Sequence, residues 1–516
     1  MKLSESIEAV RSLMDRSASC LPDEALGDKA VTAVVHRSEQ VTAGGLFVAI
    51  RGARVDGHRF VGDALARGAA AVVVEEDVEV PGGTALIRVS DTRKALGLIS
   101  ARFYGHPAED LVMIGITGTN GKTTIAWLLE GLLAAHGFHA GVIGTINYRY
   151  DGKVFDNPLT TPEASDLQRI LADMKAAGVT HVIMEVSSHG LELERVRGCS
   201  FDIGVFSNLS QDHLDFHHTM EAYREAKKRL FTVYLKPGKG RVECAAVINV
   251  ADPAGTEIAA VSEHCWLIRV GMAAQNSNIY PLDADFQPSG IKAAIRTPAG
   301  TVTVDSRLAG RFNLKNILCA VGVGVALGIP TFVIGMGINA VASVPGRLER
   351  LSDAAGRHVF VDYAHTPDAL ENVLATLREI SAGRLICVFG CGGDRDTGKR
   401  ATMGEIAGKM SDLAVITSDN PRTEAPLAII EAIREGTRPV CPQELTPAEV
   451  EASRGVAAGY VVEPDREKAI HLAIQAARPG DAVLIAGKGH ETYQIVGSRV
   501  LHFDDRETAK RGLAIN

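Results

Sequence analysis

Runs of apolar residues that end in polar residues recur along the middle of the chain and again toward its end. "LVMIGITGTNGKTT" predicts a strand, a glycine loop and a helix, and "GVTHVIMEVSSHG" and "FDIGVFSNLSQDH" predict two more buried strands. A later series comprises "RHVFVDYAHTP", "RLICVFGCGGDRD", "DLAVITSDNPRTE", "GYVVEPD" and "DAVLIAGKGHE". Apolar strands alternating with helices are typical of parallel sheets covered on both faces. Ligands bind at the carboxyl ends of such strands, so the polar residues there are candidates for chemistry.

The domain organisation follows from length and from changes in this pattern. A chain of 516 residues indicates about three domains. Residues 31–75 predict short strands and turns that end in a helix end and a buried strand, and Pro107 lies in a polar boundary stretch. A new strand series begins after "SVPGRLER". We therefore predict an α/β protein with domains at 1–107, 108–343 and 344–516.

Two stretches resemble targeting segments only superficially. Residues 317–344 carry no charge, but Gly328-Ile329-Pro330 interrupts them, which predicts two short buried helices and not a membrane span. The N-terminal "MKLSESIEAVRSLMDR" predicts an amphipathic helix with charges throughout and not a signal peptide.

Composition excludes some partners. The net charge of −8 argues against sequence-independent nucleic-acid binding, which depends on many basic side chains. Taken alone, the basic run Lys227-Lys228-Arg229 predicts a solvated helix face. The eight cysteines are scattered, so we expect reduced, buried thiols in a cytosolic protein.

The glycine loop "IGITGTNGKTTIAW" is the strongest candidate site. It has the Gly-Lys-Thr of a phosphate-binding loop, yet Ile116 stands where the usual motif has its first glycine. Glycines let backbone N–H groups approach phosphate at a helix N-terminus. Lys122 can then reach the terminal phosphates and Thr123 can offer a hydroxyl to Mg²⁺. A tight turn with an incidental lysine is the alternative, disfavoured by the strand before and the helix after.

Acidic and imidazole groups follow the next two strands. Glu185 ends one strand, and "SNLSQDHLDFHH" follows the other. These groups can hold Mg²⁺ near the loop, although Mg²⁺ prefers oxygen and His213 would be an unusual ligand. Zinc bound by His213, His217 and His218 is an alternative, as is a structural role for each histidine.

The C-terminal strands end in "GGDRD", "SDNPRTE" and "GKGHE". Arginine forks bind carboxylates, while Asp and Glu can meet an ammonium, so this set suits an amino acid or another zwitterion. A turn capped by the Asx side chains of Asp-Asn-Pro-Arg is an equal alternative. The residues predicted to line one cleft are Arg395, Asp419, Asn420, Arg422 and Glu491.

Together these motifs resemble the Mur ligase family over nearly the whole chain. The resemblance is carried by "GITGTNGKTT", "EVSSHGLELERV", "SNLSQDHLDFH", "YREAKKRLF", "GRFNLKNILCA", "PGRLE" and "VDYAHTPDAL" in that order. "NPLTTP", "LFVAIRGARVDGHRF" and "KGHETYQ" are similar to the subgroup that adds the third peptide residue. The resemblance implies a small mixed α/β N-terminal domain for the uridine nucleotide, a central P-loop-type parallel-sheet ATPase and a C-terminal Rossmann-like domain for the amino acid.

The resemblance also implies a reaction. ATP phosphorylates the D-glutamate side-chain carboxylate of UDP-N-acetylmuramoyl-L-alanyl-D-glutamate, and the amine of the new residue attacks the acyl phosphate to give an amide. "DNPR" is similar to the version that accepts meso-2,6-diaminopimelate, with Arg422 and Arg395 on the far carboxylate and Asp419 and Glu491 on the far ammonium. The implied protein is a cytoplasmic monomer in peptidoglycan precursor synthesis, acting on small molecules and not on nucleic acid or membrane.

Site residues carry over by motif. The implied ATP contacts are Gly118, Thr119, Asn120, Gly121, Lys122, Thr123, Thr124, Asn313, Asn316, Arg347 and Asp362. The implied catalytic residues are Lys122, Glu185, His213 and Lys227. The implied Mg²⁺ ligands are Thr123, Glu185, His213 and a CO₂-derived carbamate on Lys227. The implied UDP-sugar contacts are Ser38, Thr160, Thr161, Ser187, Arg195 and Lys227. The implied diaminopimelate contacts are Arg395, Asp419, Asn420, Arg422, Gly487 and Glu491.

Other functions remain as alternatives. A ligase that adds L-lysine or a folylpolyglutamate synthase would share the ATPase, but the N-terminal nucleotide domain and "DNPR" count against both. A P-loop motor would show nucleic-acid-stimulated ATPase activity, and the acidic charge disfavours it. An inactive binding protein would not need the intact set of Lys122, Thr123, Glu185, His213 and Lys227.

Overall fold

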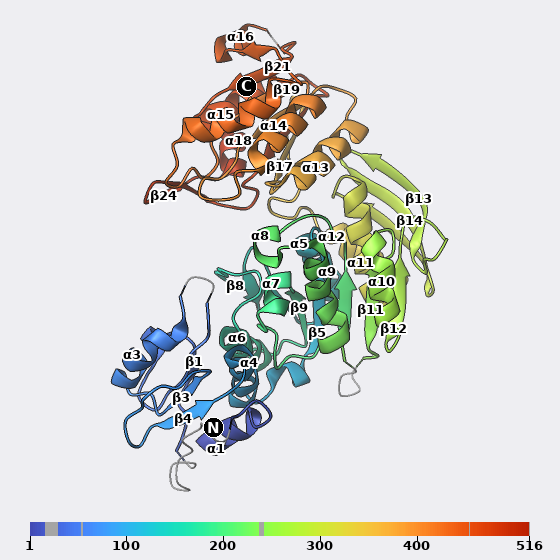
Figure 1. Ribbon diagram of the computed structural model, residues 1–516. Coiled ribbons are helices and arrows are strands. Elements are labelled where there is room, and N and C mark those ends of the chain that lie inside the picture. Colours follow the sequence, from blue (N-terminus) through green and yellow to red (C-terminus); the bar gives the residue numbers. More distant parts are fainter. Residues whose placement is uncertain (16–28, 53–54, 237–241, 454, 515–516) are drawn as a thin grey trace.

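The computed structural model describes residues 1–15, 29–52, 55–236, 242–453 and 455–514. Figure 1 shows three parts that follow one another along the chain, from the blue N-terminal part through the central part to the orange and red C-terminal part. Each part contains its own strands and helices, as expected for an α/β chain of this length. Arg16 and Cys20, and Ala53 and Arg54 of the motif "LFVAIRGARVDGHRF", lie outside the described residues.

The N-terminal part is built on a four-stranded parallel sheet in the order β1-β2-β3-β4. Its strands are β1 (Val34–Val35), β2 (Leu46–Val48), β3 (Ala71–Val74) and β4 (Ala85–Arg88). Its helices are α1 (Leu3–Ala9), η1 (Ser38–Gln40), η2 (Gly57–Phe60), α3 (Val61–Ala66), α4 (Thr92–Phe103) and η3 (Pro107–Asp110). In residues 31–75 the predicted strands and the helix end before the buried strand β3 are present. The rest of α3, and the short helices η1 and η2, were not predicted, because helices this short leave too little periodicity to detect. The N-terminal helix is also shorter than the amphipathic stretch that predicted it.

The central part has an eight-stranded sheet in the order β12-β11-β10-β5-β9-β6-β7-β8. Pairing is parallel from β12 to β6 and antiparallel at β7 and β8. The strands are β5 (Val112–Thr117), β6 (Ala140–Ile143), β7 (Tyr148–Tyr150), β8 (Lys153–Phe155), β9 (His181–Glu185), β10 (Ile203–Phe206), β11 (Ala245–Asn249) and β12 (Trp266–Val270). The three strands predicted here from apolar runs are therefore confirmed as β5, β9 and β10.

Helices cover both faces of this sheet, as its uniformly apolar strands require. One face packs on α5 (Lys122–His136), α11 (Arg311–Ala326) and α12 (Thr331–Ala340), and the other on α6 (Ala164–Ala176), α7 (Ser188–Glu192) and α10 (Pro253–Val261). The remaining helices are α8 (Leu214–His217), α9 (Met220–Arg229) and the π-helical turn η4 (Leu230–Tyr234). The uncharged stretch forms two helices, as predicted, but only α11 is buried: α12 buries one face and leaves Phe332 and Met336 exposed. Within the described ranges, no helix has the length and apolar character that crossing a bilayer demands.

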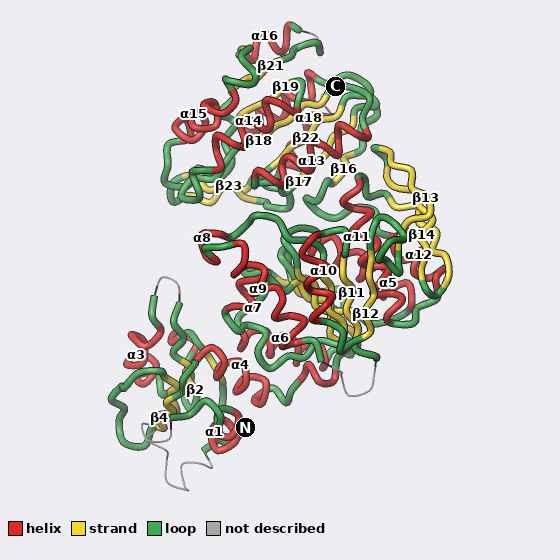
Figure 2. Tube along the Cα trace, turned by 45° about the vertical axis from the view of Figure 1, so that its right-hand side comes forward, coloured by secondary structure: helices red, strands yellow, loops and turns green. Residues whose placement is uncertain are grey.

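A separate antiparallel sheet flanks the central part, visible at its right-hand side in Figure 2. It comprises β13 (Tyr280–Gln287), β14 (Gly290–Thr297) and β15 (Gly300–Ser306). Alternate residues of β14, among them Ile291 and Ile295, point into the same core as α11 and α12. The sheet therefore extends the central core.

The C-terminal part has a seven-stranded sheet in the order β16-β17-β22-β18-β19-β21-β20, with only β16 antiparallel. Its strands are β16 (Glu349–Leu351), β17 (His358–Asp362), β18 (Leu385–Phe389), β19 (Leu413–Ile416), β20 (Glu444–Leu445), β21 (Gly459–Val462) and β22 (Ala482–Ala486). The helices are α13 (Pro367–Ile380), α14 (Lys399–Met410), α15 (Pro426–Thr437), α16 (Pro447–Ala452), α17 (Arg466–Ala476) and α18 (Asp505–Ala514). A hairpin of β23 (Tyr493–Val496) and β24 (Arg499–His502) lies on the side that faces the central part (Figure 1). All five strands predicted for this region are present.

The cysteines differ from expectation at one pair. Cys244 and Cys265 are joined in a disulfide, although we predicted reduced thiols throughout. They stand directly before β11 and β12, and Ala245 pairs with Trp266, so the register places the two sulfurs together. This proximity arises from strand pairing between residues 21 apart, which cysteine spacing alone does not reveal. The other described cysteines are free thiols.

Candidate active site

The glycine loop joins the end of β5 to the start of α5 through two backbone positions that only glycine suits. Gly118 has φ 148° and Gly121 has φ 89°. A Cβ at Gly118 would lie 1.9 Å from Ser207 Oγ, and one at Gly121 would lie 2.2 Å from Asn316 Oδ1. The glycines at these two positions are therefore explained by what packs against the loop, since both face polar side chains from neighbouring elements.

A partly buried lysine, Lys122, and a fully buried one, Lys227, converge on this loop. Lys122 Nζ donates to the carbonyls of Gly118 and Thr119, each at 2.9 Å, and Lys227 Nζ donates to the same Gly118 carbonyl at 2.8 Å. Burial lowers the pKa of Lys122 against the opposing effect of the Glu185 carboxylate. Burial lowers the pKa of Lys227 well below its ordinary value, and the Lys122 charge lowers it further.

Lys227 lies on α9, one turn after Tyr223, with Nζ 4.3 Å from the centre of the tyrosine ring. Lys227 is only 1% exposed, so the prediction that Lys227-Lys228-Arg229 forms a solvated helix face was wrong at this position. Its neighbour Lys228 is half-buried and not freely solvated, and it pairs with Glu225 and Glu257 on another face of α9. Helical geometry sends adjacent residues to different faces, which a run of charges conceals.

Glu185 stands one strand away from the loop, since β9 pairs with β5 and Glu185 lies opposite Ile116. It is 2% exposed, and its carboxylate accepts from Thr123 Oγ1 at 3.0 Å, Thr145 N at 3.0 Å and Thr145 Oγ1 at 2.8 Å. Among the described residues it forms no ion pair. A buried carboxylate that faces only neutral donors, beside a threonine hydroxyl, is an oxygen-donor set that fits Mg²⁺.

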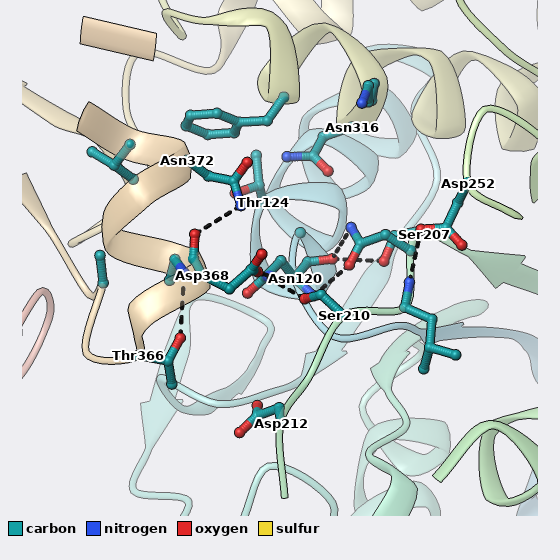
Figure 3. A pocket seen from close by; sticks show the side chains of 18 of the residues that line it. Asn120, Thr124, Ser207, Ser210, Asp212, Asp252, Asn316, Thr366, Asp368 and Asn372 are labelled. Carbon is teal, nitrogen blue, oxygen red and sulfur yellow. Dashed lines mark hydrogen bonds between the residues drawn. The ribbon is translucent and has the colours of Figure 1, made fainter. Parts of the chain in front are cut away.

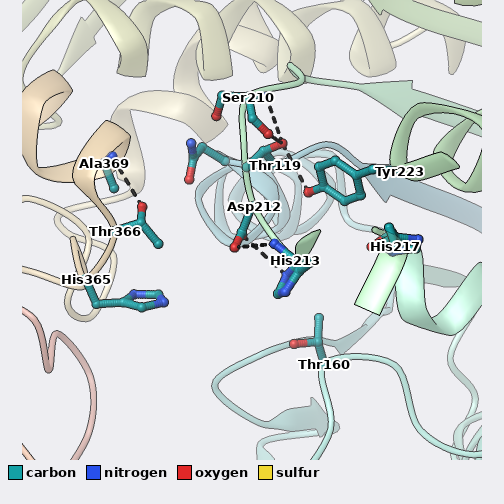
Figure 4. Close-up of polar contacts among 12 residues, drawn as sticks. Thr119, Thr160, Ser210, Asp212, His213, His217, Tyr223, His365, Thr366 and Ala369 are labelled. Atoms are coloured by element: carbon teal, nitrogen blue, oxygen red, sulfur yellow. Dashed lines mark hydrogen bonds and ion pairs between the residues drawn. The ribbon is translucent and has the colours of Figure 1, made fainter. Parts of the chain in front are cut away.

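His213 is placed differently from the other predicted metal ligands. It has φ 54°, its ring is 44% exposed, and its Nε2 lies 3.3 Å from Asp212 Oδ2 (Figure 4). Burial lowers its pKa, against the effect of Asp212. His217 is instead buried and bonds Ser188 Oγ at 2.9 Å. In the part of the chain that the structure describes, no three His, Cys, Asp or Glu side chains gather as a metal site.

A cavity of about 300 Å³ lies between the glycine loop and the C-terminal part. Figure 3 shows Asn120, Thr124 and Asn316 on one wall and Thr366, Asp368 and Asn372 of the α13 region on another. Ser210 Oγ donates to Asp368 Oδ2 at 2.8 Å, so the two parts touch beside the cavity. The cavity thus brings together residues from three segments far apart in the sequence.

The remaining predicted ATP residues border this cavity or support its wall. Arg347 lines it, donates to Thr123 Oγ1 at 3.4 Å and lies over the Tyr363 ring. Asn313 accepts from Asn316 Nδ2 at 3.1 Å and so steadies it. Asp362 also lines the cavity, but its carboxylate accepts from Leu348 N and Ala364 N, and burial raises its pKa. These hydrogen bonds hold in place the loop that carries Arg347.

Four of the predicted UDP-sugar residues gather on the other side of Glu185. Thr161 Oγ1 donates to the Glu185 carbonyl at 3.0 Å and lies 3.0 Å from Ser187 Oγ. Thr160 Oγ1 lies 3.1 Å from Thr145 Oγ1, and Arg195 Nη1 donates to the Thr161 carbonyl at 3.2 Å. Ser38 is not part of this group: it is buried in η1 of the N-terminal part.

The six predicted amino-acid residues lie at the carboxyl ends of β18, β19 and β22, and we call them the C-terminal polar cluster: Arg395, Asp419, Asn420, Arg422, Gly487 and Glu491. Asn420 Nδ2 donates to Glu491 Oε2 at 3.0 Å, and a Cβ at Gly487 would lie 3.0 Å from Asp419 Oδ2. Arg422 Nη1 donates to the Gly393 carbonyl at 2.8 Å. Arg395 is exposed at the rim. The cluster is therefore a real grouping, and more than a capped turn.

Sequence reasoning missed three residues that organise these sites. Thr145 supplies two of the three donors to Glu185, and Tyr223 both faces Lys227 and lies 3.1 Å from Thr119 Oγ1. Lys488 is fully buried inside the C-terminal polar cluster. Thr145 and Lys488 each follow a parallel strand, so the strand-end rule contained the signal, whereas Tyr223 on its helix gave none.

The chain is similar to known proteins in both sequence and structure. Three family descriptions match: "Mur ligase family, catalytic domain" over residues 30–104, "Mur ligase middle domain" over 116–324 and "Mur ligase, glutamate ligase domain" over 346–489. The chain is 49% identical over 490 residues to the UDP-N-acetylmuramoyl-L-alanyl-D-glutamate--2,6-diaminopimelate ligase of Geobacter metallireducens, covering 94% of this chain and 95% of that protein. The ligase of the same name from Geobacter sulfurreducens is 48% identical over 473 residues, covering 92% of each.

A solved structure agrees with these sequence matches. A structure of a UDP-N-acetylmuramoyl-L-alanyl-D-glutamate--2,6-diaminopimelate ligase superposes with a TM-score of 0.69 at 31% identity, covering 98% of this chain and 99% of that chain. Family descriptions, high-identity relatives and fold all point to one assignment. This chain is a member of the Mur ligase family.

Proposed function

We propose that this protein is the ATP-dependent ligase that joins meso-2,6-diaminopimelate to the D-glutamate side-chain carboxylate of UDP-N-acetylmuramoyl-L-alanyl-D-glutamate. The observation that carries the proposal is the convergence of Lys122, Lys227 and Glu185 beneath the glycine loop. On one side of them lies a cavity that suits a nucleotide, and on the other lies the Thr160, Thr161, Ser187 and Arg195 group. This arrangement suits phosphoryl transfer between two bound substrates.

The chain's own residues account for positioning the nucleotide. The backbone N–H groups of residues 121–124, at the N-terminus of α5, would face the phosphates, whereas those of Thr119 and Asn120 already donate to Asn208. Lys122 would neutralise charge on the transferred group. Asn120, Asn316 and Asn372 around the cavity provide donors and acceptors for the nucleoside. Arg347 approaches Thr123 from the C-terminal part, so it adds positive charge beside the glycine loop.

The residues that would hold Mg²⁺ are Thr123 and Glu185, with the exposed His213 as a further ligand. The metal supplies charge neutralisation for the phosphates. Thr145 keeps the Glu185 carboxylate oriented by donating from both its N–H and its hydroxyl.

We further propose that Lys227 carries a carbamate formed from CO₂. A neutral amine is required, because Nζ attacks CO₂ and releases one proton to give a carbamate anion. The lowered pKa of Lys227 and the absence of a carboxylate within hydrogen-bonding range among the described residues favour that neutral form. The carbamate nitrogen keeps one hydrogen, which can still donate to the Gly118 carbonyl. The modification converts a cation into an oxygen donor beside the Mg²⁺ set.

The C-terminal polar cluster is the proposed site for diaminopimelate. Asp419 and Glu491 suit its far ammonium, while Arg422 and the exposed Arg395 suit its far carboxylate. L-Lysine has no such carboxylate and would leave the arginine side unmatched. Domain boundaries at 107/108 and 343/344, a monomeric state and a cytoplasmic location belong to the same proposal.

The test is phosphate release from ATP and Mg²⁺ in the presence of UDP-N-acetylmuramoyl-L-alanyl-D-glutamate, with meso-diaminopimelate and L-lysine compared. We expect strong release only with diaminopimelate. Release with lysine instead would keep the ligase and overturn the specificity. Release with neither amino acid would overturn the proposed function and return the folylpolyglutamate alternative, which the diaminopimelate-ligase names of the most similar relatives disfavour.

A further inference from the structure

A buried cation sits at the centre of the C-terminal polar cluster. Lys488 follows β22, and its side chain is completely buried. Its Nζ lies 3.1 Å from Glu491 Oε2, 3.2 Å from Asn420 Oδ1 and 3.6 Å from Asp419 Oδ1. One ammonium therefore ties together the three polar residues that the proposed function assigns to the far end of the amino acid.

The topology shows why this link matters. Asp419 and Asn420 follow β19, whereas Lys488 and Glu491 follow β22, and β18 lies between these two strands in the sheet. Lys488 and the Asn420–Glu491 hydrogen bond span that interval. The hairpin joins the same network, because Ile495 N donates to Asn420 Oδ1 at 3.0 Å. Lys488 thus sets the separation of carboxylates that two different loops contribute.

The charge count has a chemical consequence. Two carboxylates and one lysine leave this side of the cluster with one negative charge in excess, the amount that balances one substrate ammonium. The buried Arg466 also faces both carboxylates, but its ion pair with Asp505 cancels its charge. Asp419 Oδ1 is buried and accepts no hydrogen bond from the described residues, and Lys488 Nζ at 3.6 Å contacts it only as an ion pair, so its hydrogen-bonding capacity is unsatisfied. On the other side, Nε and Nη2 of Arg422 donate to nothing within the described part, so they can meet a carboxylate.

We propose that Lys488 is a specificity-determining residue that positions Asp419, Asn420 and Glu491 and holds their charge at the value suited to a zwitterionic, not a cationic, far end. This inference rests on the proposed function. Without Lys488, two excess negative charges would face the ligand. They would attract the cationic end of L-lysine more than the neutral, zwitterionic end of diaminopimelate.

The test compares Lys488→Met, Lys488→Arg and the double variant Lys488→Met/Glu491→Gln. For Lys488→Met we expect KM for diaminopimelate to rise about tenfold or more, and the preference for diaminopimelate over lysine in kcat/KM to fall by a similar factor. KM values for ATP and for the UDP-sugar should stay within about twofold, because the described polar contacts of Lys488 are all with Asp419, Asn420, Glu491 and Tyr493, none of which lies in the glycine loop or lines the cavity. The double variant restores one excess negative charge, so it should recover part of the lost preference.

Several outcomes would overturn the inference. An unchanged preference in Lys488→Met, or no recovery in the double variant, would mean that Lys488 acts only in packing. If Lys488→Met does not fold, Lys488→Arg decides: it keeps the charge, so it should raise KM yet hold the preference within about threefold, and a collapsed preference would refute the idea. Wild-type protein in the same assay separates the two proposals, since its failure to use diaminopimelate would sink the proposed function itself.

Discussion

Two fully buried lysines, Lys227 and Lys488, stand in opposite electrostatic surroundings. Lys227 donates to a neutral carbonyl and lies near a second lysine, and its pKa is lowered well below its ordinary value. Lys488 lies against Glu491 and Asp419, two carboxylates that offset the loss of hydration. Burial alone therefore does not fix what a lysine does, because its partners decide whether it serves as an amine or as a cation.

The difference matches the chemistry proposed for each site. An amine without an anionic partner is a nucleophile toward CO₂, and its product brings negative charge to a metal site. A lysine paired with carboxylates cannot react in this way, but it can hold them in place. Both lysines have a tyrosine nearby, with Nζ 4.3 Å from the Tyr223 ring and 5.5 Å from the Tyr493 ring. Both lysines therefore have an aromatic neighbour, and the difference between them is that only Lys488 has carboxylate partners.

The largest expected effect comes from removing the amine at the catalytic loop. Lys227→Ala should lower substrate-dependent phosphate release by roughly 100-fold or more, because the metal site loses its anionic group. Formate added at about 0.1 M should restore part of the rate by supplying a small carboxylate in the vacated space. Measurement of phosphate release with and without formate checks this.

A matched control lies next to it on the same helix. Lys228→Ala removes a lysine paired with Glu225 and Glu257, and it should change the rate by less than about twofold without responding to formate. Full activity of Lys227→Ala would refute the carbamate. Equal losses of activity in Lys227→Ala and Lys228→Ala would mean that both substitutions act by disrupting α9.

The next prediction compares stability. Lys488→Met leaves two carboxylates buried without their cation, which typically costs about 3–5 kcal/mol. Lys227→Met instead replaces a desolvated amine by an apolar side chain of similar length, and it should leave the thermal midpoint unchanged or raise it. Calorimetric scans of both variants and wild type test this directly. Equal decreases would show that the partners do not distinguish the two lysines.

The sequence predicted most residues of both sites, but not the difference between the surroundings of Lys227 and Lys488. Strand ends located the glycine loop, Glu185 and most of the C-terminal polar cluster, because parallel strands deliver their carboxyl ends to one edge. The role of Lys227 came only from family resemblance, since a run of three basic residues hides which one faces inward. Lys488 belongs to the motif "GKGHE", which was selected because of Glu491. Its burial depends on packing between loops that the linear sequence does not display.

The same limit explains the other differences. Short helices such as α3 and the disulfide between Cys244 and Cys265 arise from tertiary packing and strand register, which leave weak local signals. The antiparallel sheet of β13, β14 and β15 alternates buried and exposed positions, a readable pattern that the search for apolar runs passed over. Local pattern therefore predicted the buried parallel strands well and the one-sided strands poorly.

The smallest expected effect is a pH dependence that differs in sign between adjacent lysines. Because the pKa of Lys227 is lowered in the folded protein, the unfolded chain binds more protons between the folded and unfolded pKa values. Stability relative to Lys227→Met should therefore rise as pH increases toward the ordinary lysine value, with a slope of at most about 1.4 kcal/mol per pH unit. Hydrogen bonds to Glu225 and Glu257 raise the pKa of Lys228, so its contribution is full below the ordinary value and is lost above it.

The measurement is the thermal midpoint of wild type, Lys227→Met and Lys228→Met in bicarbonate-free buffers from about pH 7 to pH 10, so that no carbamate alters the charge at Lys227. As pH rises across this range, the thermal midpoint of wild type should increase relative to that of Lys227→Met. The difference in midpoint between wild type and Lys228→Met should stay constant and then decrease at the alkaline end. A wild-type curve parallel to that of Lys227→Met would mean that Lys227 is charged in the folded state. In that case the neutral amine, and with it the contrast with Lys488, would fail.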